Sequence, residues 1–260
     1  MAPIALTIAG SDASGGAGIQ ADLKTFHQLG VYGQAVLTLI TVQNSVRLSR
    51  VEVLPADLVA EQLGAVLEDC PPAAAKTGAL GSAEIVEVIA RIAGTFGFPL
   101  LVDPVMVSKH GGRLLPSGTA EALVTRLLPV AALVTPNLPE AEALTGMAIC
   151  TTGDMRQAAR ILHQKGARAV LVKGGHLDGD PVDILFDGTV FRELAVPRIP
   201  TRHTHGTGCT YSAAITAGLA RGLGLYDAVA RAKEFISEAI RTNPGLGRGA
   251  GPVNHFAEVP

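Results

Sequence analysis

The stretch PIALTIAGSDASGGAGIQADLKTF, residues 3–26, contains the local pattern on which the fold prediction rests. Pro3–Ala9 is short and apolar, as a buried strand is, and the glycine-rich segment Gly10–Gly18 follows it directly. Ile19, Leu23 and Phe26 then recur at helical spacing, which places them on one face of a helix. The stretch therefore predicts a strand, a tight turn and an amphipathic helix.

The same alternation of strand-like and helix-like segments continues along the chain. It predicts an α/β fold whose mostly parallel sheet is covered by helices on both faces. With no linker or internal repeat in the sequence, we expect one domain over residues 1–260. The further strands expected are Val31–Val42, Ala73–Lys76, Leu100–Val102, Ala131–Val134, Ala169–Lys173 and a hairpin of Val182–Phe186 with Val190–Val196; the helices are Leu58–Leu67, 85–96, Met155–Leu162, Gly208–Arg221 and Tyr226–Arg241.

The composition excludes several classes of protein. Of 260 residues, 48% are apolar and 17% are charged, which excludes a disordered chain. Lysine and arginine number 21 against 23 acids, so we expect no nucleic-acid partner. Apolar runs are too short to span a membrane, and the first residues do not resemble a signal peptide. Three cysteines without a CxxC pair favour a reduced compartment, so the expected location is cytoplasmic.

The glycine-rich segment Gly10–Gly18 has two interpretations. It can be a flexible turn, or it can bring the backbone close to a small ligand. Gly16–Ala21 matches the dinucleotide pattern G-x-G-x-x-A, which also requires an acid near the end of the second strand. Gln43-Asn44 stands there instead, which argues against a nicotinamide-dependent oxidoreductase. No P-loop pattern occurs anywhere in the chain.

The stretch Thr204–Thr210, THGTGCT, is more specific. Its glycines precede an apolar helix, and the backbone N–H groups at a helix start bind negative charge. Cys209 falls in the first helical turn, where a thiolate is stabilised, so we expect a lowered pKa for this thiol. The alternative is a structural cysteine at a helix cap.

Two further motifs follow predicted strands. Asn137–Glu140, NLPE, either holds a magnesium ion through water or forms a capping box at a helix start. Lys173–His176, KGGH, either lies along a phosphate or simply turns the chain. Because ligands of open α/β sheets bind beyond the carboxyl ends of the strands, we expect these motifs and Asp103 to meet at one cleft.

Taken together, the motifs resemble one family. They are ALTIAGSDASGGAGIQADLKTF, TVQNS at 41–45, LVDPVMVSKHGG, LVTPNLPEAEAL, VLVKGGH and HTHGTGCTYSAA, in an order preserved from about Ala5 to Phe256. They are similar to those of the hydroxymethylpyrimidine/phosphomethylpyrimidine kinases of thiamine biosynthesis, in the ribokinase-like superfamily. The resemblance implies a three-layer α/β/α fold with a mostly parallel central sheet and at most a small β flap.

The resemblance also implies an activity and its cofactors. These kinases use ATP and Mg²⁺ to phosphorylate 4-amino-5-hydroxymethyl-2-methylpyrimidine, and then convert the monophosphate to the diphosphate. A homo-oligomer, such as a dimer, is expected. The rival activities are a pyridoxal kinase of the same superfamily and a non-catalytic pyrimidine-binding protein.

The resemblance carries residue roles onto matching positions of this chain. Those implied for the pyrimidine pocket are Ala17, Asp22, Gln43, Leu80 and Val105. The anion hole is implied at Gly206, Thr207, Gly208 and Cys209, with Cys209 as the catalytic base. Those implied for magnesium and the phosphates are Asn137, Glu140 and Asp103, and those near the nucleotide are Lys173, Gly175, His205 and Lys233. Two positions depart from the pattern: Leu80, where relatives often carry methionine, and the lid-like stretch VSKHGG around Lys109 to Gly112.

Overall fold

The computed structural model describes residues 2–106 and 118–258, and across them the strands form one nine-stranded sheet. The strand order is β3-β2-β1-β4-β5-β6-β7-β8-β9. The parallel strands are β1 (Ile4–Asp12), β2 (Tyr32–Gln43), β4 (Ala74–Thr77), β5 (Leu100–Val102), β6 (Leu133–Val134) and β7 (Val170–Val172). Antiparallel pairing adds β3 (Leu48–Val53) at one edge and β8 (Val182–Phe186) with β9 (Phe191–Ala195) at the other.

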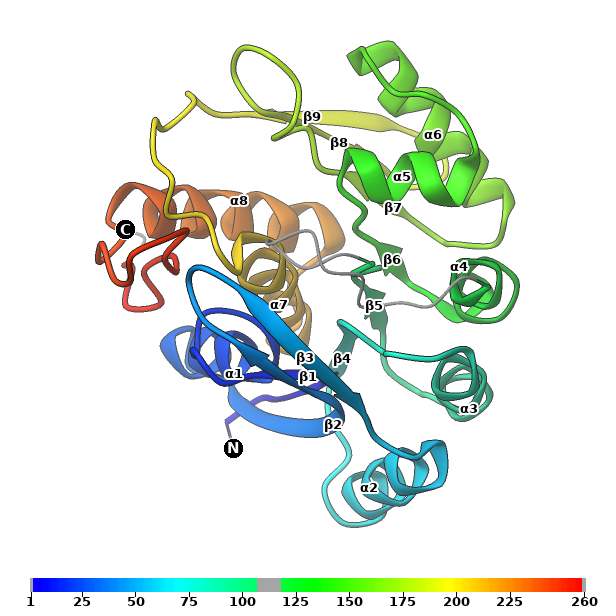
Figure 1. Ribbon diagram of the computed structural model, residues 1–260. Helices are drawn as coiled ribbons and strands as arrows, with labels where there is room; N and C mark the ends of the chain where they lie inside the picture. Colours follow the sequence, from blue (N-terminus) through cyan, green and yellow to red (C-terminus); the bar gives the residue numbers. More distant parts are fainter. Residues whose placement is uncertain (1, 107–117, 259–260) are drawn as a thin grey trace.

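Helices cover both faces of this sheet (Figure 1). One face carries α1 (Gly18–Gln28), α7 (Thr207–Ala220) and α8 (Leu225–Arg241). The other face carries α2 (Ala56–Asp69), α3 (Ala83–Ala93), α4 (Thr119–Ala122), α5 (Leu138–Thr145) and α6 (Thr152–Gln164). A π-helical turn, Leu123–Leu127, and a 3₁₀ turn, Leu128–Val130, continue α4. The predicted three-layer fold with a mostly parallel sheet is therefore confirmed.

Two apolar cores explain why the layers pack. The sheet and helices α2, α3, α5 and α6 bury residues such as Ile85 and Leu162, while α7 and α8 bury Ile215 and Phe235 on the opposite face. Burial of apolar area is the main favourable contribution to folding, so these two cores hold the sheet between its helices. None of the helices in the part of the chain that the structure describes has the length and apolar character needed to cross a membrane.

Strand β3 is the element that the sequence pattern missed. It pairs with residues Leu39–Gln43 of β2 in an antiparallel ribbon, which is the small β flap that the resemblance implied. No residue of β3 is fully buried, so its sequence lacks the apolar alternation by which a half-buried strand is recognised. The lid-like stretch that includes Lys109 to Gly112 lies outside the described residues.

Candidate active site

A cavity of about 590 Å³ lies at the carboxyl ends of the parallel strands. It contains most of the residues that the sequence predicted for the site, which come from segments far apart in the chain. Those that line it are Ala17, Gln43, Asp103, Val105, Asn137, Glu140, Lys173, Gly175, His205, Gly206, Thr207, Gly208 and Cys209. The expected convergence of the strand-end motifs is therefore confirmed.

Leu80 does not line the cavity, so the structure does not bring it together with the other predicted pocket residues. Strand β4 ends at Thr77, and the next two residues, Gly78 and Ala79, line the cavity instead. Leu80 is 1% exposed and packs into the apolar core beside helices α2 and α3. The chain therefore turns away from the site one residue earlier than the sequence match implied.

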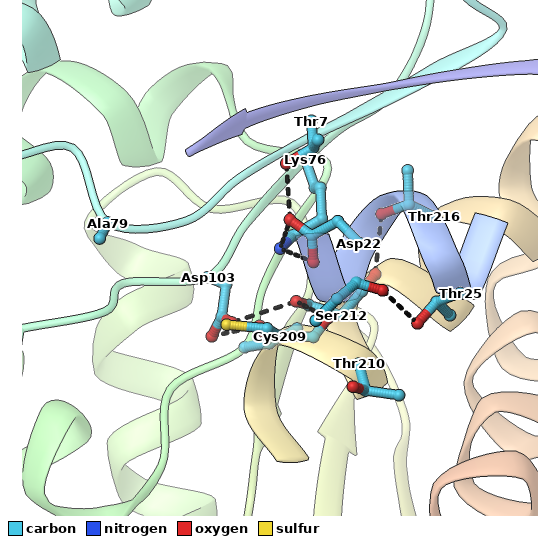
Figure 2. Close-up of polar contacts among 12 residues, drawn as sticks. Thr7, Asp22, Thr25, Lys76, Ala79, Asp103, Cys209, Thr210, Ser212 and Thr216 are labelled. Atoms are coloured by element: carbon cyan, nitrogen blue, oxygen red, sulfur yellow. Dashed lines mark hydrogen bonds and ion pairs between the residues drawn. The ribbon is translucent and has the colours of Figure 1, made fainter. Parts of the chain in front are cut away.

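Asp22 is also absent from the cavity lining, because its carboxylate is bound by other side chains of the protein. Lys76 Nζ donates to Asp22 Oδ1 at 2.9 Å and to Oδ2 at 2.8 Å, and Thr7 Oγ1 donates to Oδ2 at 2.6 Å (Figure 2). Both members of the ion pair are fully buried. The structure therefore does not bring Asp22 to the cavity surface, and its contact with a pyrimidine stays a prediction.

Lys76 is a site-adjacent residue that the sequence analysis missed. Burial lowers the pKa of its ammonium, but the Asp22 carboxylate, together with Cys209 and Asp103, outweighs burial, and the pKa is raised. Lys76 therefore carries a positive charge below the cavity floor, where a Cβ on Gly78 would lie 3.8 Å from its Nζ. A lysine inside the otherwise uncharged strand AAKT is the signal that could have identified it.

Lys233 is not among the residues that line the cavity, so the structure does not place it at the nucleotide side and its predicted role there stays a prediction. Its Nζ donates to Asp183 Oδ2 at 2.7 Å, and both side chains are buried. The helical spacing of α8 turns Lys233 toward the sheet rather than toward the cavity, because it shares the buried face with Val229 and Ile236.

The start of helix α7 forms a cradle of backbone groups at the cavity. Gly206 has φ +78°, and a Cβ at this position would lie 1.7 Å from Gly16 O, so only glycine fits. The N–H groups of Gly208 and Cys209, in the first turn, have no acceptor within the helix and border the cavity. Lys173 Nζ lies 3.4 Å from the Cβ position of Gly208. This arrangement suits a phosphate.

Cys209 borders the same cradle, but its thiol is not activated as the sequence analysis predicted. Burial raises the pKa of the Cys209 thiol to about 12, although the Lys76 ammonium and the Gly18 N–H act in the opposite direction. The prediction of a lowered pKa is therefore wrong. The helix start favours a thiolate, but removal of the sulfur from water has the larger effect.

Asp103 joins three elements at the centre of the site. Lys173 Nζ donates to its Oδ1 at 3.0 Å. Ser212 Oγ in α7 donates to its Oδ2 at 3.1 Å (Figure 2). Thr135 Oγ1 also donates to Oδ1, at 3.3 Å. The carboxylate thus fixes the direction of the Lys173 ammonium next to the cradle.

Asn137 and Glu140 form the capping box that the sequence analysis kept as an alternative to a metal site. Glu140 N donates to Asn137 Oδ1 at 2.9 Å, and Asn137 N donates to Glu140 Oε2 at 2.8 Å. Burial raises the pKa of Glu140 to about 7, partly offset by Lys173. Within residues 2–106 and 118–258 no group of three or more His, Cys, Asp or Glu side chains could hold a metal ion.

Asp12 and His205 join two loops of the site, and Asp12 is a second residue that sequence reasoning missed. Asp12 Oδ2 lies 2.7 Å from His205 Nε2 and accepts the Ala17 N–H at 2.9 Å. Burial raises the pKa of Asp12, but the hydrogen bonds from His205 and Ser14 prevail and lower it to about 2. His205 therefore lines the cavity while its Nε2 holds the glycine-rich turn.

Gln43, at the end of β2, brings a polar group to the cavity. Its Oε1 is buried, and no hydrogen-bond partner for it occurs among the residues that the structure describes. Buried polar atoms in proteins are nearly always paired. The cavity therefore suits a ligand with a hydrogen-bond donor near the flap.

A family model described as phosphomethylpyrimidine kinase matches residues 12–254. The chain belongs to this family. The hydroxymethylpyrimidine/phosphomethylpyrimidine kinase of Streptomyces coelicolor is 49% identical over 253 residues, which are 97% of this chain and 94% of that protein. The thiamine biosynthesis bifunctional protein ThiED of Geobacter sulfurreducens is 54% identical over 253 residues, and the chain spans 52% of its length.

Among solved structures, pyridoxal kinase from Staphylococcus aureus in complex with AMP-PCP and pyridoxal superposes with a TM-score of 0.91. It is 40% identical, and the match covers 99% of this chain and 94% of that one. This likeness confirms the ribokinase-like fold. As a phosphomethylpyrimidine kinase family member the chain is a phosphotransferase.

Proposed function

We propose that this chain transfers phosphoryl groups from ATP in two steps. The first acceptor is the hydroxymethyl group of 4-amino-5-hydroxymethyl-2-methylpyrimidine, and the second is the phosphate of the resulting monophosphate. The observation that carries the proposal is that one cavity contains both Gln43 Oε1, for which the described residues offer no hydrogen-bond partner, and the backbone cradle Gly206–Cys209. The exocyclic amine of an aminopyrimidine can donate to this oxygen, while the cradle receives phosphate.

The phosphates of ATP would lie between the cradle and the turn after β7. Lys173 and Gly175 line this side of the cavity, and the Lys173 ammonium lies beside the start of α7 at Gly208. Phosphoryl transfer depends mainly on positioning and on neutralising charge. The Lys173 ammonium, fixed by Asp103, supplies a positive charge that does not have to reorient during the reaction.

Magnesium would be held on the Glu140 side of the cavity. Mg²⁺ keeps several waters and takes few protein ligands, so a pair of carboxylates, Glu140 and Asp103, suits it without a cluster of three ligands. Asn137 orients Glu140 through the capping box. When bound, the ion would neutralise phosphate charge.

Cys209 is the proposed acceptor of the hydroxyl proton in the first step. As the acceptor oxygen bonds to the γ-phosphorus, the bond from that phosphorus to the departing diphosphate oxygen breaks. The hydroxyl proton passes to Cys209 Sγ. Because burial keeps this thiol protonated in the ligand-free protein, Cys209 must first release its own proton to solvent, and the nearby Lys76 ammonium favours that release.

Pyridoxal phosphorylation is the second candidate, because a pyridoxal kinase with bound pyridoxal shares the fold over nearly the whole chain. The deciding experiment measures ADP release with the hydroxymethylpyrimidine, its monophosphate and pyridoxal, each with and without Mg²⁺. Magnesium-dependent turnover of both pyrimidines at a higher kcat/KM than that for pyridoxal supports the proposal. A higher kcat/KM for pyridoxal would overturn it. The cytoplasmic location and the homo-oligomer stay predictions from the sequence.

A further inference from the structure

Asp183 is a buried acid that connects the turn after β7 with helix α8. Its Oδ1 accepts the Gly174 N–H at 2.9 Å, and its Oδ2 accepts from Lys233 Nζ at 2.7 Å. Asp183 is 2% exposed, and the Lys233 side chain is 9% exposed. Strand β8 lies beside β7, and Asp183 is not among the residues that line the cavity, so its buried carboxylate contacts the turn from the protein interior.

The turn held in this way carries the groups proposed to meet the ATP phosphates. Lys173 and Gly175, on either side of Gly174, both line the cavity. Gly174 itself is pressed against β8, since a Cβ there would lie 1.9 Å from Val182 O. The Lys173 N–H bonds to Pro136 O at 2.9 Å, so the turn is fixed at one end by β6 and behind by Asp183.

Folding alone does not call for a charged pair at this place. Removing two charges from water is unfavourable, and apolar side chains of similar size are often as stable or more stable. Lys233 lies on the buried face of α8, among side chains such as Phe235 and Ile236, and its Nζ lies 6.0 Å from the ring centroid of Tyr211. An apolar residue would fit the pattern of this face. The ion pair is therefore better explained by the hydrogen bond that Asp183 accepts from the Gly174 N–H.

We propose that Asp183 and Lys233 are positioning residues for the nucleotide. Lys233 fixes the Asp183 carboxylate, and the carboxylate fixes the Gly174 N–H, so that the Lys173 ammonium and the Gly175 backbone face the phosphates. This inference rests on the proposed placement of ATP at Lys173 and Gly175. Neither residue touches the substrate, so both act through the turn.

Two matched double variants test the proposal: Asp183→Leu with Lys233→Met, and Asp183→Asn with Lys233→Met. Both remove the ion pair, but only the asparagine variant keeps an acceptor for the Gly174 N–H. Dissociation constants for AMP-PCP and for the pyrimidine are measured by calorimetry, together with the melting temperature. Lys173→Met reports separately on whether the turn binds nucleotide, and Phe235→Leu reports on general loosening of α8.

The leucine variant should weaken AMP-PCP binding by about tenfold or more, because the Gly174 N–H loses its acceptor. The asparagine variant should lose less affinity, because it keeps an acceptor for the Gly174 N–H but not the Lys233 ammonium that fixes this acceptor. Phe235→Leu should bind AMP-PCP nearly as the parent does, and pyrimidine binding should be unchanged throughout. Equal AMP-PCP affinity in the two double variants would overturn the inference. If Lys173→Met leaves AMP-PCP affinity unchanged, the placement of ATP is wrong and the inference fails with it.

Discussion

Lys76 and Asp22 form an ion pair that is fully enclosed between β1, β4, α1 and the start of α7, although 54 residues separate them in the sequence. Loss of one partner leaves the other charge buried and unpaired. Lys76→Met should therefore lower the free energy of unfolding by about 3–5 kcal/mol, measured by urea denaturation. The double variant Lys76→Met with Asp22→Leu should recover much of this loss. A double variant no more stable than Lys76→Met would show that the charge on Asp22 is not the cause.

Gly206 is expected to tolerate no side chain, because a Cβ there meets Gly16 O at 1.7 Å. Gly222 is the matched control, since its φ of +83° is similar but no atom lies within 4 Å of its Cβ position. Gly222→Ala should cost only about 1–2 kcal/mol of backbone strain. Gly206→Ala should lose more stability and, where it remains folded, most of its ATP affinity. Equal losses of stability in the two variants would mean that the loops of Gly206 and Gly16 can separate to accommodate a side chain.

Gln43→Leu should lower kcat/KM for the hydroxymethylpyrimidine by about tenfold or more, because a ligand donor is left unpaired in a closed site. Gln34 is the control on the same strand: its Oε1 is also buried without a partner among the described residues, but it does not line the cavity. Steady-state kinetics of both leucine variants, with ATP saturating, separate the two cases. The assignment of Gln43 to the pocket fails if both variants keep parental kinetics.

Glu140 is expected to have two roles, which two substitutions separate. Glu140→Gln keeps an acceptor for the Asn137 N–H but removes the charge, so stability should change little while the Mg²⁺ concentration for half-maximal activity rises. Glu140→Ala also breaks the capping box and should cost about 1 kcal/mol more in unfolding free energy. Melting curves and Mg²⁺ titrations measure both effects. An unchanged Mg²⁺ requirement in both variants would show that Glu140 acts only in the capping box and not in Mg²⁺ binding.

Cys209→Ala should lower kcat of the first phosphorylation by about 10²–10⁴-fold, the usual contribution of a general base. The second step should lose less, because its acceptor phosphate is already ionised at neutral pH. Cys70→Ala, away from the cavity, is the control. If both steps slow equally, Cys209 acts through the shape of the cradle instead.

The raised pKa gives this prediction a pH dependence. The Cys209 thiol has a pKa of about 12, so at lower pH its thiolate fraction increases about tenfold for each unit by which the pH is raised. First-step kcat should therefore rise with pH between 7 and 10. The Cys209→Ala enzyme should show no such rise. A parental profile that is flat over this range would exclude the thiolate as the base.

The local motifs could be predicted from the sequence because each depends on near neighbours. The turn Gly10–Gly18 follows from its place between a strand and a helix, and the glycines of Gly206–Cys209 follow from their place at a helix start. The role of Asp22 could not be predicted, since its partner Lys76 belongs to a different strand. The pKa of the Cys209 thiol could not be predicted either, because it also depends on residues distant in the sequence. The helical position of Cys209 is visible in the sequence, whereas the burial that raises its pKa is a property of the packed protein.

The contact between Gly206 and Gly16 has a consequence for how the enzyme is made. Residues near the two ends of the chain meet there, and helices α1 and α7 pack together beside them. A ribosome-bound chain that has exposed only its first strands and helices has Gly16 in place but no partner for it. The phosphate cradle therefore forms only after α7 has been synthesised and has docked against α1. A nascent chain that ends before α7 therefore lacks the cradle, even though its glycine-rich turn is already present.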